Sequence, residues 1–259
     1  DLHEPYRRQR QMCIRDRETG AMKRLSGETR TNPYDLFALE AALQLREKVG
    51  GSVTVLTMGP PQAEEMMRDA YTMGADDAVI LSDRKFAGAD VLATSYALSQ
   101  GITAIGDVDL IICGKQTTDG DTAQVGPAIA EHLGIPHAAW VSEIVDADSE
   151  AIQVKQDLVS VSQTSKIPYP CLITVDKDMC VPRLPSYLLQ KQSKDRPVKI
   201  MTFEDMADQN LSKYGLVGSP TAVEKMFAPP EVEKQVYFDG DAKEKTKQLF
   251  DVLVNKKVI

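Results

Sequence analysis

The stretch that decides the fold is DLIICGKQTTDGDTAQVGP, residues 109–127. Its first residues, Asp109–Cys113, are mostly apolar and have the length of a buried strand. A loop rich in Gly, Thr and Asp follows, and apolar spacing then predicts a helix over residues 122–133 that ends at Gly134. This order places the loop at the carboxyl end of a strand, which is where open α/β sheets bind ligands.

The same alternation of strands and helices extends toward the N-terminus. Strands are predicted at residues 53–58 and 78–81, and helices at residues 63–73 and 90–104. Asn32 and Pro33 indicate the start of another helix, with Asn32 as its cap and Pro33 at its first position. The methionines at helical spacing, Met66, Met67 and Met73, are interpreted as core residues. Short connections between alternating elements predict an α/β fold with a mostly parallel, Rossmann-like sheet covered by helices on both faces.

The pattern changes after Pro136. Residues 138–145, 151–161 and 171–175 are predicted to be strands without helices between them, forming an antiparallel extension of the sheet. Beyond Pro182 the chain is polar and rich in proline, and it closes with an amphipathic helix near residues 242–253. We therefore expect one nucleotide-binding α/β domain over residues 18–185 and an arm over residues 186–259 that lies on a partner.

The first 17 residues differ from the rest of the chain. They hold a cluster of five arginines, Arg7, Arg8, Arg10, Arg15 and Arg17. The string resembles a translated sequencing-adapter remnant, so we expect residues 1–17 to contribute nothing native. An α/β fold of this kind would begin with a strand before Asn32, and we expect that strand to be missing or overwritten.

Composition excludes several classes of function. The formal net charge is −8 and no basic face is evident, which argues against a nucleic-acid partner. No apolar run approaches the roughly 20 residues of a membrane span. The four cysteines show no pairing pattern, which indicates a reducing compartment and a cytoplasmic protein.

The loop after Cys113 is the best candidate for chemistry. Gly114 and Gly120 permit close backbone approach, and the free N–H groups at the start of the next helix can hold a phosphate. Thr122 and Gln124 add neutral donors, Asp121 is expected to cap the helix, and Asp119 is expected to brace the loop. An ordinary turn with an Asp cap explains the same pattern, because the loop is neither a Walker A motif nor a G-x-G-x-x-G fingerprint.

Other chemistries have weaker support. His132 and His137 lack the neighbouring ligands of a metal site. Cys113 could be a nucleophile, but an apolar strand cysteine usually belongs to the core. We therefore predict no catalytic residue and no metal ligand.

Several segments, which occur in the same order along the chain, resemble those of one known family, the electron-transfer flavoprotein beta subunit. They are Asn32–Asp35, Leu56–Pro60, Met73–Asp76, Ser82–Arg84, Ala87–Asp90 and the stretch from Cys113–Gln116 through Gly126–Pro127. The resemblance runs from about Glu18 to the C-terminus. It implies a sandwich of the adenine-nucleotide alpha hydrolase type and a heterodimer with an alpha subunit that carries FAD.

The resemblance also implies a bound adenine nucleotide, either AMP or a second FAD. Asn32, Pro33 and Tyr34 would line the adenosine, Met58 would lie beside it, and residues 119–126 would wrap the phosphates. The implied cofactor-binding set is Asn32, Pro33, Tyr34, Met58, Asp90, Thr94, Gly114, Asp119, Gly120, Asp121, Thr122, Ala123, Gln124, Val125 and Gly126. The closest likeness is to electron-bifurcating members, in which Thr94 and Ser95 would help hold the diphosphate of FAD.

Residues 176–188 resemble the loop that docks on an acyl-CoA dehydrogenase, with Met179, Pro182 and Leu184 as docking residues. Met179 would be the exposed anchor of this loop, or else a loop residue folded inward. The strand around Lys155–Val159 lacks the glycines of the family pattern, which leaves the detail of that hairpin open.

The chain is thus expected to be an electron-carrier subunit, and part of an enzyme only in the bifurcating case. The rival is a stand-alone adenine-nucleotide sensor or hydrolase on the same fold, against which the proline-rich tail argues.

Overall fold

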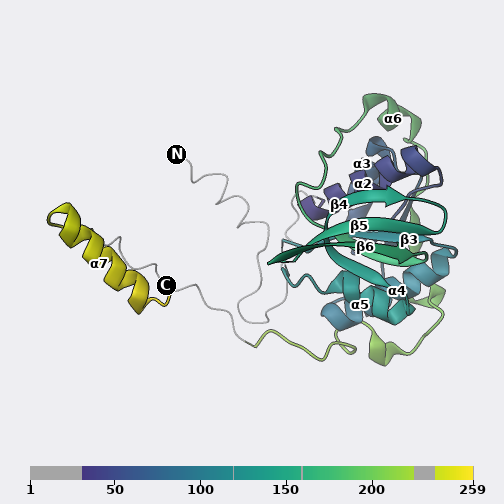
Figure 1. Cartoon of the computed structure of the whole chain (residues 1–259). Helices are drawn as coiled ribbons and strands as arrows, with labels where there is room; N and C mark the ends of the chain where they lie inside the picture. Colours follow the sequence, from purple (N-terminus) through teal and green to yellow (C-terminus); the bar gives the residue numbers. More distant parts are fainter. Residues whose placement is uncertain (1–30, 119, 159, 225–236, 259) are drawn as a thin grey trace. The chain divides into compact units, whose positions relative to one another are not determined.

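The structure is a computed structural model that describes residues 31–118, 120–158, 160–224 and 237–258 (Figure 1). The expectation for residues 1–17 therefore lies outside the described residues. The chain divides into two units, one that runs to Glu224 and one that begins at Lys225.

The first unit alternates helices and strands over most of its length. Its helices are α2 (Pro33–Val49), α3 (Glu64–Met73), α4 (Val91–Ile105), α5 (Val125–Leu133) and α6 (Tyr187–Gln192). Its strands are β1 (Thr54–Met58), β2 (Asp77–Leu81), β3 (Leu110–Gly114), β4 (His137–Ala147), β5 (Ala151–Leu158), β6 (Val161–Pro168), β7 (Cys171–Val175) and β8 (Lys199–Met201). Short 3₁₀ turns lie at Pro61–Ala63, Arg84–Phe86, Phe203–Asp205 and Leu211–Lys213.

The strands form two hydrogen-bonded sets. One has the order β1-β2-β8 and is parallel throughout, and the other has the order β3-β7-β4-β5-β6. In the second set β3, β7 and β4 are parallel, while β4, β5 and β6 are antiparallel. The predicted antiparallel extension is confirmed for β4, β5 and β6, but β7 at residues 171–175 pairs parallel with both of its neighbours. The expected strand over residues 151–161 is wrong. It ends at Leu158, and Val161 begins β6, which pairs back with it.

Helices cover both faces of the strands, because apolar side chains along a strand point alternately to one face and to the other. In β2, Ala78 and Ile80 pack with α2 and α3, whereas Val79 and Leu81 pack on the side of α4. Figure 1 shows α2 and α3 on one side of the strands and α4 and α5 on the other. The predicted α/β class is confirmed.

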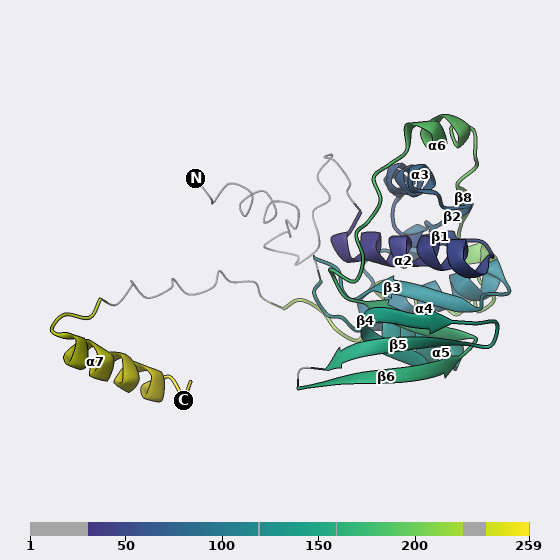
Figure 2. The ribbon, with the colours of Figure 1, turned by 45° about the horizontal axis from the view of Figure 1, so that its top comes forward.

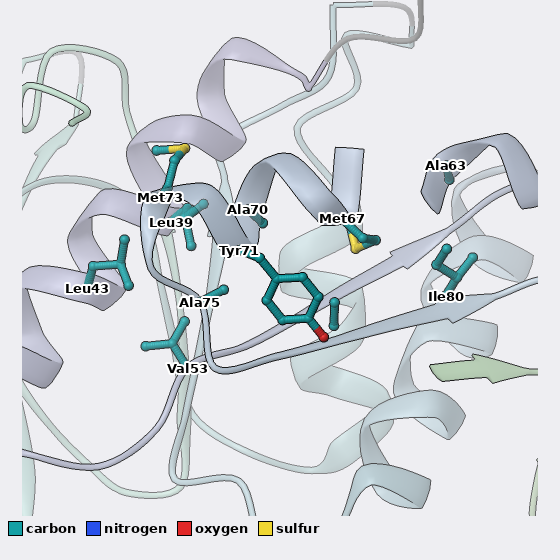
Figure 3. Close-up of a cluster of buried hydrophobic side chains, with 11 residues drawn as sticks. Leu39, Leu43, Val53, Ala63, Met67, Ala70, Tyr71, Met73, Ala75 and Ile80 are labelled. Carbon is teal, nitrogen blue, oxygen red and sulfur yellow. The ribbon is translucent and has the colours of Figure 1, made fainter. Parts of the chain in front are cut away.

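Apolar side chains at helical spacing on α3 form part of the core. Met67, Tyr71 and Met73 are buried together with Leu39 and Leu43 of α2 (Figure 3). The methionines at helical spacing are therefore core residues, as predicted, and α6 lies beside α3 (Figure 2).

The predicted domain boundary at residue 185 is wrong. The chain beyond it adds β8 to β2 and buries Met201, Phe203, Met206 and Tyr214 in the core beside α4. Asp208 strengthens this attachment, because its carboxylate accepts hydrogen bonds from Lys213 (2.7 Å) and from Tyr96 of α4 (2.5 Å). These bonds and the backbone N–H of Asn210 lower the pKa of Asp208 to about 2. The boundary between the two units instead follows Glu224.

The second unit contains α7 (Ala242–Asn255). Asp241 caps the helix through the N–H groups of Lys243 and Glu244, and the Glu244 side chain accepts from the Asp241 N–H in return. Leu249, Phe250 and Leu253 lie at helical spacing on one face, as the sequence predicts, and no residue of the helix is buried.

Gly126 is a packing constraint of the first unit. A Cβ at this position would lie 2.5 Å from Thr174 Cγ2 of β7, so α5 approaches the sheet only because residue 126 has no side chain. We predict that Gly126→Ala lowers the free energy of unfolding by about 2 kcal/mol through overpacking. Urea titration followed by circular dichroism measures this change.

Thr174→Ser provides the matched rescue, since it removes the obstructing methyl group and keeps the hydroxyl that accepts from Trp140 N–H. The double variant should lose less stability than the sum of the two single changes. Gly59→Ala is the control, because its nearest neighbour would be Ala63 Cβ at an ordinary 3.5 Å. Strict additivity in the double variant would contradict the packing argument.

Candidate functional site

The start of α2 is joined to the end of β3 by side-chain hydrogen bonds. Asn32 Nδ2 donates to Gln116 O (2.8 Å) and to Asp35 Oδ2 (2.9 Å). Asn32 precedes the helix and Pro33 opens it, as predicted, but the Asn32 side chain makes no capping hydrogen bond. Its amide instead reaches across to the loop that follows β3.

Gly114 makes this close approach possible. Its N–H donates to Asp35 Oδ1 (3.0 Å), and a Cβ there would lie 2.5 Å from Asp35 Oδ1 and 2.7 Å from the carbonyl carbon of Tyr34. Burial raises the pKa of Asp35 against the effect of its hydrogen bonds. Burial, together with Asp35, also raises the pKa of the Cys113 thiol to about 12. Cys113 is partly buried and packs with Ile129, Ala130 and Leu172, as expected of an apolar strand cysteine.

The loop after β3 is longer than predicted, because α5 begins at Val125 and not at Thr122. Asp121 (φ 53°) and Ala123 (φ 54°) have left-handed backbone conformations, which interrupt any helix there. The prediction that Asp121 caps the helix is wrong: the N-cap residue is Gln124, and Asp121 accepts a hydrogen bond from Gln116 Nε2. Asp119 lies outside the described residues.

The start of α5 therefore carries no side-chain cap and no acidic residue in its first turn. The N–H groups of Val125 and Gly126 point along a helix dipole that favours an anion. Gly120, Asp121, Thr122 and Gln124 are exposed on the loop before it. A Cβ on Gly126 would lie 3.7 Å from Cys113 Cβ, so the starts of α2 and α5 both lie at the end of β3.

One buried polar atom in this region has no partner. Asn32 Oδ1 is the only buried side-chain nitrogen or oxygen among the described residues without a hydrogen bond. A buried acceptor left unpaired costs on the order of 1–3 kcal/mol, and such atoms call for an explanation. The end of β3 thus combines an unpaired acceptor with an uncapped helix start.

The structure places other predicted cofactor residues in different surroundings. Asp90 caps α4 through Ala93 N–H (3.1 Å), and its second oxygen accepts from Thr221 Oγ1 (2.7 Å). Ser95 is fully buried and donates to Leu92 O, so the expectation that it serves as a phosphate donor is wrong. Thr94 is half-buried in the first turn of α4. Met58 is half-buried at the carboxyl end of β1 and packs with the core beside α4.

The predicted docking segment is arranged differently from the expectation. Met179 is half-buried against the core formed by β4, β5 and β7, so its interpretation as the exposed anchor is wrong. Leu184 is 86% exposed, and Pro182 is half-buried. Val181, Tyr187 and Leu188 are also exposed, and residue type alone did not identify them.

A second group that sequence reasoning missed joins the ends of β3 and β7 to a residue within β4. Lys115 Nζ forms an ion pair with Asp176 (2.8 Å) and lies 4.7 Å from the centre of the Trp140 ring. Trp140 has a left-handed backbone conformation (φ 60°) beside a register shift between β4 and β7, and its N–H donates to Thr174 Oγ1. A tryptophan in that conformation has no signature in the sequence.

The fold and the site together define an α/β protein whose mostly parallel strands are covered by helices on both faces. A loop at the carboxyl end of β3 occupies the position where such folds bind ligands. The chain belongs to the electron transfer flavoprotein family, whose domain matches residues 19–207. The resemblance seen in the sequence motifs is thereby confirmed.

Relatives match over most of the chain. It is 42% identical to Protein FixA of Bradyrhizobium diazoefficiens, covering 91% of this chain and 84% of the relative. It is 43% identical to the electron transfer flavoprotein subunit beta of Thermoanaerobacterium thermosaccharolyticum, covering 88% and 87%. The acryloyl-CoA reductase electron transfer subunit gamma of Anaerotignum propionicum is 40% identical, covering 93% and 92%. The chain is therefore an electron transfer flavoprotein subunit of the beta type.

We predict that Gly114→Ala separates the start of α2 from the end of β3. The new Cβ would meet backbone and Asp35 atoms at 2.5–2.8 Å, and these atoms cannot move without shifting the helix. Stability should fall by about 2 kcal/mol. Urea unfolding followed by circular dichroism measures this change.

Gly120→Ala is the control for stability. Its nearest neighbour would be Thr117 Oγ1 at 3.5 Å, an ordinary contact, so its unfolding free energy should match that of the parent. A Gly114→Ala protein with parental stability would show that the close approach is dispensable.

Proposed function

We propose that this chain pairs with an electron transfer flavoprotein alpha subunit and binds an adenine nucleotide at the end of β3. The observation that carries the proposal is the unpaired, buried acceptor Asn32 Oδ1 beside an uncapped helix start. Adenosine offers the exocyclic N–H donors that such an acceptor lacks, and a phosphate suits the free N–H groups of Val125 and Gly126. The residues present therefore fit the nucleotide.

The chain's own residues would bind and orient this nucleotide. Asn32, Pro33 and Tyr34 would line the adenosine with Met58 nearby, and residues 119–126 would surround the phosphates. Gly114 keeps the two parts of the site close together. Asp90 has both carboxylate oxygens engaged, so its contribution would be to hold the start of α4 in place.

The identity of the nucleotide separates two versions of the proposal. AMP would make the chain a structural partner of the alpha-subunit flavin, whereas a second FAD would supply a second redox centre of the electron-bifurcating kind. Because Ser95 is buried and engaged, a diphosphate would rely on Thr94 and the 119–126 loop. The likeness of the segments at residues 32–35, 87–95 and 118–127 to bifurcating members favours FAD.

We predict two FAD molecules per heterodimer, with NADH-dependent bleaching of the flavin absorbance. The measurement is flavin and AMP stoichiometry in the heterodimer purified with its alpha subunit, followed by anaerobic titration with NADH. One FAD and one AMP per heterodimer would reject bifurcation and leave the nucleotide site intact. A heterodimer with one FAD and neither AMP nor a second flavin would reject the nucleotide site itself.

The proposal includes docking on an acyl-CoA dehydrogenase-type flavoenzyme through residues 181–188. Leu184 and Val181 are each 86% exposed, and an exposed apolar side chain in a polar surface is typical of a binding hot spot. Met179, which packs inward, would support the segment from below.

We predict that Leu184→Glu weakens docking by about 2 kcal/mol, because it replaces an apolar contact with an unpaired charge. The measurement is the half-saturating concentration of a short-chain acyl-CoA dehydrogenase in electron transfer to the heterodimer. Val161→Glu is the matched control, since Val161 is similarly exposed but lies on β6. Equal half-saturation for Leu184→Glu and the parent would exclude this segment as the docking surface.

The rival function, a stand-alone nucleotide sensor or hydrolase, is not favoured by the family match. We place the protein in the cytoplasm, because Cys113, Cys171 and Cys180 are all unpaired. In the part of the chain that the structure describes, no helix is both long and apolar enough to cross a membrane.

A further inference from the structure

The exposed segment that follows β7 is held to the body of the protein by an ion-pair clamp. Arg183 Nε and its backbone N–H both donate to Glu40 Oε2 (2.8 and 3.0 Å), and Nη2 donates to Glu40 Oε1 (3.1 Å). Arg183 Nη1 reaches Glu47 Oε1 (2.6 Å), which lies further along α2 on the same face of the helix. The guanidinium group and the backbone N–H of a single arginine thus donate hydrogen bonds to two carboxylates of the same helix.

Glu40 is unusual for a carboxylate because its side chain is only 4% exposed. Burial alone would raise its pKa, but the hydrogen bonds from Arg183 and from Gln44 outweigh burial and hold the pKa below its usual value. The hydrogen bonds to Glu40 and Glu47 in turn raise the pKa of the Arg183 guanidinium. A buried charge of this kind is tolerated only while its partner stays in place.

Two further contacts hold this segment. Ser186, which follows Leu184 in the chain, donates its N–H to Thr72 O of α3 (2.8 Å), and Cys180, which precedes Arg183, contacts Phe37 O of α2 through Sγ (3.6 Å). Leu184 lies between Arg183 and Ser186, so it is presented on a short span fixed at both ends. Pro185 further restricts that span.

We propose that Arg183 is a positioning residue for partner docking: its fork on Glu40 and Glu47 fixes the segment that presents Leu184. This inference rests on the docking surface of the proposed function and adds the residue that orders it. Preorganisation of a binding loop increases affinity because less conformational entropy is lost when the partner docks. The Arg183 side chain acts through Leu184 and its neighbours and need not touch the partner.

The test uses the heterodimer and two measurements. For Arg183→Gln, the half-saturating concentration of a short-chain acyl-CoA dehydrogenase should rise about ten-fold while the rate at saturation stays within about two-fold. Hydrogen–deuterium exchange in the absence of the dehydrogenase should be faster in the peptide that covers residues 180–188 and unchanged in β5 and β7. Arg183→Lys keeps the charge but not the fork, so it should recover only part of both effects.

Arg46→Gln is the matched control for general destabilisation. Arg46 also lies on α2 and also forms a partly buried ion pair, with Asp76 at 2.6 Å, and its other hydrogen bond goes to Gly74 O. This variant should lose stability without a change in half-saturation. An equal rise in half-saturation for Arg46→Gln would overturn the positioning role of Arg183.

The remaining outcomes separate the two proposals. Unchanged half-saturation or unchanged exchange in Arg183→Gln, with a clear effect of Leu184→Glu, would overturn the positioning role alone. No effect of Leu184→Glu would overturn the docking surface and the positioning role with it, while the nucleotide site would be unaffected.

Discussion

The contact between the start of α2 and the end of β3 is the constraint on which the site depends. It requires the absence of a side chain at Gly114, a hydrogen bond from Gly114 N–H to Asp35, and the amide of Asn32 on Gln116 O. Burial of Asp35 makes its ionised form costly, so this contact is held at some expense in stability. Structures commonly retain such local costs where they support function.

The sequence predicted the parts of the fold that periodicity determines. β2 and β7 are short apolar runs, and α4 begins at its Asp90 cap within one residue of the predicted boundary. These features depend on local chemistry, namely alternation, capping and glycine stops. The family-level conclusion was also available, because ordered motifs such as Asn32–Asp35 and Cys113–Gln116 are specific in combination.

The features that escaped prediction depend on contacts between distant residues. β8 has three residues, two of them exposed, and becomes a strand only because the edge of β2 offers it hydrogen-bond partners. Met179 was interpreted as an anchor from the resemblance of its loop to that of the family, but the apolar core of β4, β5 and β7 lies within its reach. The start of α5 was misplaced because Asp121 suggested a cap, whereas its left-handed conformation and that of Ala123 postpone the helix. No local rule assigns those torsions.

The helix α2 links the two proposed activities of this subunit physically. Asp35 in its first turn accepts a hydrogen bond from Asn32 in the candidate site, and its middle and last turns hold the carboxylates that bind Arg183. A helix of this length extends about 25 Å and behaves as a rigid element between its ends. The buried face of α2, which includes Leu39 and Leu43, fixes it to the sheet along that length. The proposed nucleotide residues and the proposed docking residues therefore keep a constant separation as long as α2 remains packed.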